Sequence, residues 1–209
     1  DDYEFDLNLL NITGSDTVTF ENTNSDSLIK TLDLINVGVP ISVSSHFSTI
    51  KAAGQTDKDI NLNITADTNL STTGSAKDLL VNANGKSVTL TSSTADQDII
   101  IKNSNNTDIT ANSALRNLTI TSNGDVTLRE LSALQGNIDV TSVGSIIVTN
   151  ATNVTGTLTL NNERAPAGTD ITITDANSAG KVSIKSAGSI TATSNNGLAS
   201  AQIIDLTAA

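Results

Sequence analysis

Cysteine, methionine and tryptophan are absent from this 209-residue sequence, which has only one tyrosine, three phenylalanines and one histidine. Without cysteine, the chain has no disulfide scaffold, no reactive thiol and no Cys-ligated metal. With so few rings, large aromatic side chains cannot dominate the packing, so the interior must be aliphatic. Because methionine is missing even at position 1, we expect the sequence to begin inside a longer or processed precursor.

Positive charge is also scarce, because 11 basic residues stand against 22 acidic ones and the formal net charge is −11. Such a chain repels the phosphate backbone of nucleic acids and anionic membrane surfaces. No apolar run approaches the ~20 residues that a membrane-spanning helix needs. We therefore expect no nucleic-acid partner and no membrane insertion by this segment.

The residues that are abundant are Ser, Thr, Asn, Asp, Ala and Gly. Short polar side chains compete for backbone hydrogen bonds, and they favour turns and solvated pleated surfaces over helices. Together with an aliphatic interior, this composition predicts an all-β protein.

A repeat of 19 to 20 residues runs through most of the chain. Apolar-x-apolar triplets begin segments, here called rungs, at Ile41, Ile60, Leu79, Ile99, Leu118, Ile138, Leu158, Val182 and Ile203. The spacings between these starts are 19, 19, 20, 19, 20, 20, 24 and 21 residues. The alternation within each triplet is typical of a strand that buries one face.

Apolar residues occupy the same columns in successive rungs. At the start and two residues later stand Leu79 and Val81, Ile99 and Ile101, Leu118 and Ile120, Ile138 and Val140, Leu158 and Leu160, and Val182 and Ile184. Eight and ten residues after the start stand Val126 and Leu128, Ile146 and Val148, and Ile190 and Ala192, while Leu70 and Ile109 hold only the later position. Sixteen residues after the start stand Ala76, Ala95, Leu115, Leu134, Val154 and Leu198. Three inward-facing stretches per rung predict a three-sided coil.

Glycine marks the corner between the first two strands of several rungs. The glycines six residues after a rung start are Gly85, Gly124, Gly144 and Gly188. Glycine tolerates positive φ and close backbone approach, so we expect one or the other at these corners. At the same place the rung from Ile99 has Asn105 and Asn106, the next best residues for a left-handed conformation.

These features predict an all-β, right-handed parallel β-helix (β-solenoid) with three sides and a rung of about 19–20 residues. A β-sandwich also has short alternating strands, but its spacings need not repeat and its corners need not hold glycine in register. A leucine-rich repeat is the closest rival. Its pattern is matched once, by Leu115, Leu118, Ile120 and Asn123, but the match does not recur and the helical return segment is missing.

Residues 1–40 fit the repeat poorly, although Val18 to Phe20 and Leu32 to Leu34 resemble strands. We therefore divide the chain into an irregular N-terminal rung or cap, 1–40, and a regular parallel β-helix, 41–209. The sequence stops one strand into a new rung without a capping element, so we expect the helix to be truncated here and to continue in the parent chain.

Residues suited to catalysis are few. His46 is the single histidine, so a hydrolytic triad is not expected. The closest carboxylate pairs, Asp57 with Asp59 and Asp96 with Asp98, fall at rung corners, where solvated turn residues are the ordinary explanation. The regular rungs also lack the aromatic rings on which polysaccharide-cleaving β-helices usually stack sugars. We therefore predict a protein that is not an enzyme and has no catalytic or cofactor-binding residues.

Calcium is the one ion that the sequence leaves open. The glycine-rich nonapeptide that binds Ca²⁺ in stacked turns is absent. The four carboxylates of Asp57, Asp59, Asp96 and Asp98 could still share an ion with backbone carbonyls. No residue is assigned as a metal ligand.

Paired threonines recur in the second strand, and we expect them to point outward. The pairs are Thr89 and Thr91, Thr172 and Thr174, and Thr191 and Thr193. Such T-x-T ladders resemble those of ice-binding solenoids, but Arg129, Ile147 and Asn112 interrupt the array. Threonine suits the solvated face of any pleated sheet, which is the favoured explanation.

Strand, glycine corner and strand repeat in LTITSNGDVTL, IDVTSVGSIIVTN and VSIKSAGSITATS. These segments resemble the rungs of bacterial surface solenoids, both filamentous-haemagglutinin-like adhesins and the β-helical parts of Gram-negative S-layer proteins. The resemblance covers about residues 41–206 and is architectural. The acidic, cysteine-free composition, rich in Thr, Ser, Asn and Ala, is similar to that of S-layer proteins in particular.

The resemblance implies a structural segment of an S-layer protein, which forms a stiff rod at the extracellular cell surface. Its partners would be further copies or neighbouring subunits of a surface assembly. The main alternative is a cell-surface or secreted adhesin passenger that binds host cells or glycans. A polysaccharide lyase or hydrolase and an ice-binding solenoid are further alternatives.

Overall fold

The computed structural model describes residues 5–10, 18–22, 29–35, 41–45, 49–53, 59–73, 78–92, 98–110, 112–113, 116–132, 136–178, 180–193 and 203–208. Their regular structure consists of β-strands that pair in parallel, which confirms the all-β prediction. Among these residues there is no helix of the length and apolarity needed to cross a membrane.

The strands form two sheets. Sheet A follows the order β1 (Phe5–Leu10), β3 (Ile29–Ile35), β5 (Thr49–Ala53), β7 (Thr68–Thr73), β9 (Val88–Ser92), β11 (Thr107–Ile109), β14 (Val126–Ser132), β16 (Ile146–Val154), β18 (Ile171–Ser178) and β20 (Ile190–Thr193), with β12 (Asn112–Ser113) beside β14. Sheet B follows the order β2 (Val18–Asn22), β4 (Ile41–Ser45), β6 (Ile60–Ile64), β8 (Leu79–Asn82), β10 (Asp98–Ser104), β13 (Asn117–Ser122), β15 (Ile138–Ser142), β17 (Leu158–Asn161), β19 (Lys181–Ser186) and β21 (Ile203–Ala208).

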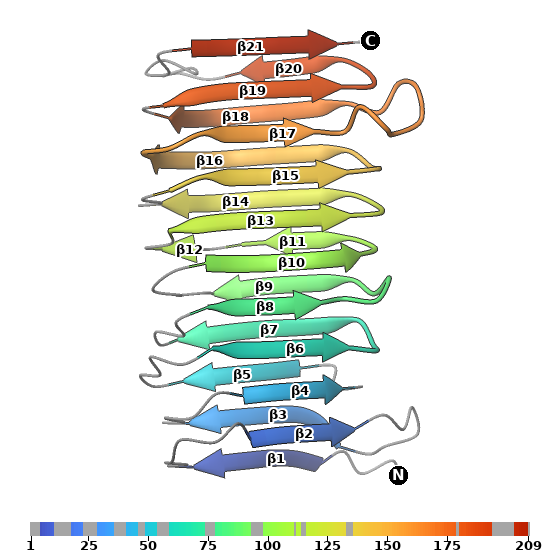
Figure 1. Ribbon diagram of the computed structural model, residues 1–209, viewed down its shortest axis with the longest axis vertical. Helices are drawn as coiled ribbons and strands as arrows, with labels where there is room; N and C mark the ends of the chain where they lie inside the picture. The colour runs from blue at the N-terminus through green and yellow to red at the C-terminus, as the bar shows by residue number, and fades with distance from the viewer. Residues whose placement is uncertain are drawn as a thin grey trace.

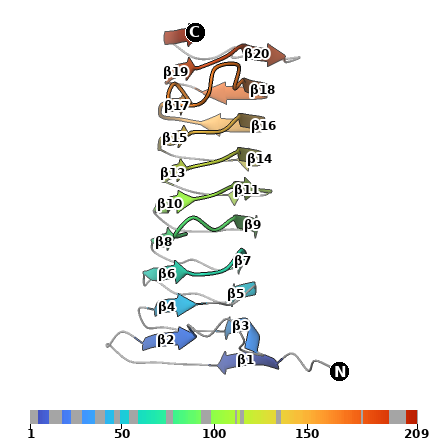
Figure 2. The same ribbon diagram turned by 90° about the vertical axis from the view of Figure 1, so that its right-hand side faces the viewer.

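The chain alternates between the two sheets as it climbs, which makes a right-handed solenoid. In Figure 1 the strands of sheet B run to the right and those of sheet A run to the left, while the chain rises from its N-terminus to its C-terminus. Figure 2, seen from the right-hand side, has sheet B on the left and sheet A on the right, so sheet B is the front layer of Figure 1. A front layer that runs right, a back layer that runs left and an upward climb define a right-handed coil, as predicted.

Strand register confirms the rung of about 20 residues. The predicted rung starts pair directly in successive sheet B strands, in the series Ile41, Ile60, Leu79, Ile99, Leu118, Ile138, Leu158 and Val182. The predicted start of the last rung is wrong by one residue, because Val182 pairs with Ile204 and not with Ile203. The alternating apolar pair is Ile204 and Leu206, which the neighbouring Ile203 obscures in the sequence.

The core lies between the sheets and is aliphatic, as predicted. Ile120, Val140, Leu160 and Ile184 pair in register and are 0, 1, 0 and 0 % exposed. Each buried side chain of this size contributes about 1.5–3 kcal/mol. The strands show the expected alternation, with a buried-exposed-buried-exposed-buried pattern in β6 and β15.

A short third stretch of parallel pairing follows the sheet A strands in the middle rungs. Leu131 pairs with Ala151, and Ala151 pairs with Ala176. The residues just before this stretch, Glu130 and Asn150, have left-handed φ values of 49° and 61°, which turn the strand into a new direction. The three-sided cross-section is therefore confirmed in these rungs. The predicted third column lies outside the described residues at Ala76, Ala95, Leu115, Leu134 and Leu198, and the side chain of Val154 does too.

Glycine corners differ in the reason that they need glycine. Gly85 has a φ of 76° and open space around the position of a Cβ atom. A Cβ atom on Gly144 would lie 2.5 Å from the carbonyl carbon of Gly124 and 2.6 Å from the amide nitrogen of Asp125, so this corner needs close packing instead. Gly124 is packed in the same way, against the carbonyl oxygen of Asn105.

The expectation of a left-handed residue at Asn105 or Asn106 is wrong. Asn103, with a φ of 55°, is the left-handed residue of that corner. The side chain of Asn106 has a different task, because its Oδ1 atom accepts a hydrogen bond of 2.9 Å from the amide of Asp125 in the next rung.

The N-terminal strands extend both sheets. β2 pairs with β4, and Val18 lies opposite Ile41. β1 pairs with β3, and β3 pairs with β5. The offset of 23 residues between Val18 and Ile41 is longer than the regular rung of about 20 residues. The irregular spacing before residue 40 therefore comes from longer connections between strands that belong to the same solenoid. The division of the chain at residue 40 stays a prediction.

Candidate functional site

Among the connections whose residues are all described, the longest is the loop between β17 and β18, residues 162–170. Nine residues connect these two strands, whereas three residues, 143–145, connect β15 and β16 in the preceding rung. The loop extends beyond the other corners on the right-hand side of Figure 1. It moves the second-strand pair of this rung to Ile171 and Ile173, both of which are buried in register with Ile146 and Val148.

Asn162 anchors this loop to the solenoid. It is fully buried and follows β17 in a column that contains serine in neighbouring rungs, at Ser104, Ser122, Ser142 and Ser186. Its side-chain amide donates to the carbonyl oxygens of Gly144 (3.3 Å), Thr169 (3.2 Å) and Asp170 (3.4 Å). Its Oδ1 atom accepts from the amide of Ala187 at 3.2 Å. The longer asparagine side chain thus reaches both neighbouring rungs and the far end of the loop.

Hydrogen bonds within the loop fix its shape. The amide of Ala165 donates to the carbonyl oxygen of Asn162 (2.8 Å), and the amide and hydroxyl of Thr169 donate to the carbonyl oxygen of Pro166 (3.1 and 2.6 Å). The amide of Glu163 donates to Oδ1 of Asn161 at 2.9 Å. Gly168 adopts a left-handed φ of 84°. The loop is therefore a defined turn structure on the edge of the solenoid.

A groove of about 420 Å³ lies beside this loop, at the end of the sheet B strands. Its lining residues are Asn103, Thr121, Ser122, Asn123, Thr141, Ser142, Val143, Asn161, Glu163 and Arg164. Amide, hydroxyl, carboxylate and guanidinium groups line it, and Val143, 40 % exposed, adds an apolar surface. The groove therefore offers many hydrogen-bond donors and acceptors, and its surface is more polar than apolar.

The two charged residues of the groove have different environments. The carboxylate of Glu163 lies 4.0 Å from the ammonium group of Lys185. For Arg164, no ion pair is found with the residues that the structure describes. An exposed guanidinium group without an ionic partner can donate to an incoming polar ligand.

Sequence reasoning did not select the residues of this groove. They come from four successive rungs, and most of them are Asn, Ser and Thr, which are common throughout the chain. The signal that could have located them is the 24-residue spacing between Leu158 and Val182, which marks the inserted loop. Of the carboxylates that the sequence suggested for catalysis or calcium, Asp59 and Asp98 are described, and neither lines the groove.

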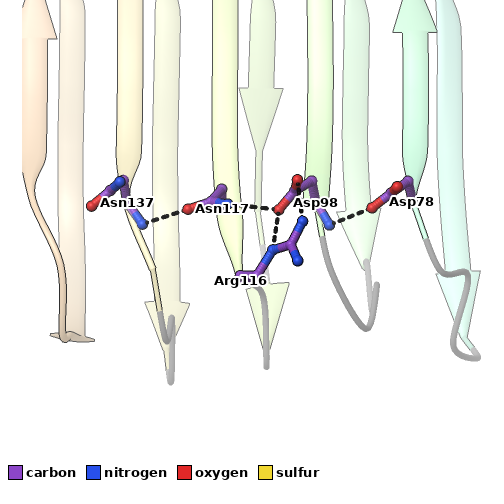
Figure 3. Close-up of polar contacts among 5 residues, drawn as sticks. All are labelled: Asp78, Asp98, Arg116, Asn117 and Asn137. Atoms are coloured by element: carbon purple, nitrogen blue, oxygen red, sulfur yellow. Dashed lines mark hydrogen bonds and ion pairs between the residues drawn. The ribbon is translucent and has the colours of Figure 1, made fainter.

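Asp98, one of those candidates, belongs to a polar ladder at the opposite corner (Figure 3). Its carboxylate accepts hydrogen bonds from Nε (3.0 Å) and Nη2 (2.8 Å) of Arg116 and from Nδ2 of Asn117 (2.8 Å). Its amide donates to Oδ1 of Asp78 at 3.0 Å, and the amide of Asn137 donates to Oδ1 of Asn117 at 3.0 Å. The side chains thus link four successive rungs along the axis.

The ladder determines the charge state of Asp98. The hydrogen bonds from the Arg116 guanidinium, more than any other contact, hold the pKa of the Asp98 carboxyl below its ordinary value, against an opposing effect of burial. The pKa of Arg116 is raised by the same hydrogen bond and charge. Both partners are therefore ionised at neutral pH, and the carboxylate that the sequence offered to Ca²⁺ binds a guanidinium group instead.

The other calcium candidates are not gathered around Asp98 in the described part of the chain. Asp59 lies just before β6, in the column of Asp78 and Asp98, and is half-buried. Asp57, Asp96 and His46 lie outside the described residues. What the sequence suggests about calcium at the two aspartates and about catalysis at His46 therefore stays a prediction. No group of three or more His, Cys, Asp or Glu side chains suited to a metal occurs among the residues with described positions.

Threonines form two outward columns on sheet A, and Ile147 and Arg129 interrupt them as predicted, because Ile147 pairs with Thr172 and Arg129 pairs with Thr149. Thr127 and Thr149 also belong to them, because Thr127 pairs with Ile147 and Thr149 pairs with Thr174. A further interruption, which was not predicted, is Asp108, which pairs with Thr89 and with Thr127 and forms an ion pair with Arg129. Asn112 does not interrupt the array, since it lies in β12 and pairs with Leu131 of the third stretch.

A second groove, of about 330 Å³, lies on the outer face of sheet B. It is lined by Asn61, Leu62, Asn63, Leu80, Val81, Asn82, Ile100 and Lys102. Leu80 and Ile100 pair across neighbouring strands. Asparagine side chains connect the rungs beside them, because Nδ2 of Asn82 donates to Oδ1 of Asn63 at 3.0 Å.

Comparison with family models, with curated proteins and with solved structures found no match. The resemblance to bacterial surface solenoids therefore remains an expectation from the rungs of the sequence. The function has to be inferred from the solenoid itself and from the groove beside the 162–170 loop.

Proposed function

We propose that this chain is a structural segment of a bacterial surface protein of the S-layer type, which forms a stiff extracellular rod within an assembly. The observation that supports the proposal is the continuity of the structure. Both parallel sheets and one aliphatic core run through every described rung from β4 to β19. Such a coil resists bending, because each rung bonds to the next along two sheets.

Side-chain ladders add to this stiffness at the corners. At one corner the Asp78, Asp98, Asn117 and Asn137 side chains bond to the following rung. At the other corner the Oδ1 atoms of Asp67, Asn106, Asp125 and Asp170 each accept from an amide about 20 residues further on. Local opening of a rung must break these bonds as well as the sheet, which supports a protease-resistant surface rod.

We also propose that the segment is not an enzyme. The groove beside the 162–170 loop contains one carboxylate, Glu163, whereas glycoside hydrolysis by the common mechanism needs two. Incubation of the chain with neutral and acidic polysaccharides should leave their length unchanged. Reproducible depolymerisation that is lost in Glu163→Gln would overturn this part of the proposal.

Assembly is tested on the full-length parent protein. Electron microscopy of its cell surface should show ordered two-dimensional arrays. Light scattering of the purified protein, with and without millimolar Ca²⁺, should show association into particles larger than a monomer. A parent protein that is strictly monomeric under both conditions contradicts the S-layer proposal.

A second candidate function is that of a cell-surface or secreted adhesin, whose target is a host cell or glycan. The specific observation that favours it is the polar groove, since a purely structural rung needs no nine-residue loop. Retained binding of the isolated segment to cells, without array formation by the parent, would favour the adhesin over the S-layer subunit.

A further inference from the structure

We propose that the groove beside the 162–170 loop binds a neutral oligosaccharide through hydrogen bonds to its hydroxyl groups. The proposal names the ligand of the second candidate function and rests on that function. It is independent of whether the parent forms an S-layer array. The geometry of the groove, its chemistry and its charge each support this ligand.

The polar groups of the groove are arranged in register along the solenoid axis. Thr121 pairs with Thr141, and Thr141 pairs with Asn161, so three outward side chains stand in one column on consecutive rungs. Neighbouring strands lie about 4.8 Å apart. This repeat is close to the length of one sugar unit in an extended β-linked chain, so successive sugars can meet equivalent groups.

Hydroxyl and amide side chains match the hydrogen-bonding pattern of sugar hydroxyls. Asn103, Asn123 and Asn161 each carry a donor and an acceptor at the end of the side chain, and Thr121 and Thr141 carry hydroxyls that do both. Some of this capacity is used internally. The backbone amide of Asn103 donates to Oγ1 of Thr121 at 3.3 Å, its side-chain Nδ2 donates to Oδ1 of Asn82 at 3.4 Å, and Oδ1 of Asn161 accepts from the amide of Glu163. A sugar hydroxyl likewise donates and accepts at one atom, so the groove can satisfy it in either orientation.

The 162–170 loop supplies charged hydrogen-bonding groups at one side of the groove. Arg164 offers a planar set of donors, and Glu163 offers acceptors. Neighbouring hydroxyls of a sugar ring can bind such groups in pairs, and hydrogen bonds to charged groups are stronger than those between neutral ones. Because Asn162 anchors the loop, Glu163 and Arg164 are already in position when a ligand binds.

Charge favours a neutral ligand over an ionic one. Glu163 and Arg164 give the groove no net charge, while the whole chain carries −11. An acidic polysaccharide would be repelled by the protein as a whole. A divalent cation would find a single carboxylate in this groove.

Val143 adds the apolar contact that a sugar ring needs. It is 40 % exposed and lies in the corner that lines the groove. One face of a pyranose ring carries C–H groups, which can pack on an aliphatic side chain. Because no aromatic ring lines the groove, affinity for a single site should be weak, and binding would be strengthened by multiple copies on a surface.

The test uses the intact 209-residue chain and saturation-transfer NMR with four hexasaccharides. The probes are β-1,4-linked glucose, β-1,4-linked N-acetylglucosamine, α-1,4-linked glucose and, as the acidic probe, α-1,4-linked galacturonate. We expect at least one neutral hexamer to bind and the galacturonate hexamer not to bind. Arg164→Ala and Thr141→Val should each weaken binding, the former by about tenfold or more.

The matched control is Arg129→Ala, an exposed arginine on sheet A that is paired with Asp108 and lies outside the groove. It should leave the affinity unchanged. Binding that both groove variants retain would place the glycan elsewhere and overturn this site, although the adhesin function would stand. Binding of the acidic hexamer alone would overturn the ligand class. If no hexamer binds while the chain still adheres to cells, the carbohydrate proposal is wrong and the adhesin proposal is not.

Discussion

The carboxylate of Asp98 accepts two hydrogen bonds, of 3.0 and 2.8 Å, from the guanidinium group of Arg116, which lies one rung further along the chain. This bidentate geometry is the strongest way to join an arginine to a carboxylate. It lies within a row of acidic and amide side chains at the corner before the sheet B strands (Figure 3). The charge of Asp98 is therefore part of how successive rungs are held together.

The Asp98–Arg116 pair should make stability depend on pH. Because the folded pKa of Asp98 is lowered below the ordinary unfolded value of about 3.9, the pair stabilises the fold above about pH 4, and this contribution is lost as pH falls through the folded pKa. Asp98→Asn should lower the unfolding free energy at pH 7 by up to about 1 kcal/mol, since the pair is partly exposed, and by less at pH 2.5. Urea unfolding at both pH values measures the difference. Equal losses at both values would show that the charge of Asp98 contributes nothing.

Adjacent residues of β16 test the inward and outward faces of sheet A. Val148 is fully buried, whereas Ile147 is 41 % exposed. Val148→Asp would place a charge in the aliphatic core and should lower the unfolding free energy by about 3–5 kcal/mol. Ile147→Asp is the matched control and should stay within about 0.5 kcal/mol of the original chain. Similar melting temperatures for the two variants would contradict the strand register.

The repeat made the core predictable, because burial in a solenoid is decided by column. Val140 could be placed from the sequence alone, since an apolar residue occurs two positions into each neighbouring rung. The predicted column was wrong at Ile203, because the adjacent Ile204 fits it equally well by residue type. The prediction was also wrong for Asn105 and Asn106, since residue type alone does not tell which asparagine of a corner is left-handed.

The candidate groove was not predictable from residue types. Thr121, Thr141 and Asn161 look like any solvated strand residues, and they form a site only because a loop from a later position stands beside them. Sequence motifs reveal chemistry mainly through rare residues such as histidine. The single histidine, His46, lies outside the described residues. The length of one rung was the informative quantity.

Two glycine corners should respond differently to alanine. At Gly144 the added Cβ atom would meet backbone atoms of Gly124 and Asp125 at 2.5–2.6 Å, so neighbouring rungs would have to separate. At Gly85 there is open space, and the cost is that of a left-handed alanine, about 1 kcal/mol. Gly144→Ala should therefore be clearly more destabilising in thermal unfolding than Gly85→Ala. The reverse order would show that φ, and not packing, requires glycine at these corners.

Two substitutions can separate the effect of Asn162 on the stability of its corner from its effect on the 162–170 loop. Asn162→Ala leaves the part-buried carbonyl of Gly144 and the amide of Ala187 without this partner, so it should lower both the melting temperature and the resistance of the loop to protease. Asn162→Ser restores the side chain found at this column in neighbouring rungs, but it is too short to reach Thr169 and Asp170 together. It should melt closer to the original chain while trypsin cuts after Arg164 faster, because cleavage requires local opening of the loop. Mass spectrometry of a timed digest identifies that cut, and Asn61→Ala, at an exposed asparagine of sheet B outside the groove, serves as the control. If Asn162→Ser is cut no faster than the original chain, the bonds within the loop are sufficient to fix it, and Asn162 stabilises the corner alone.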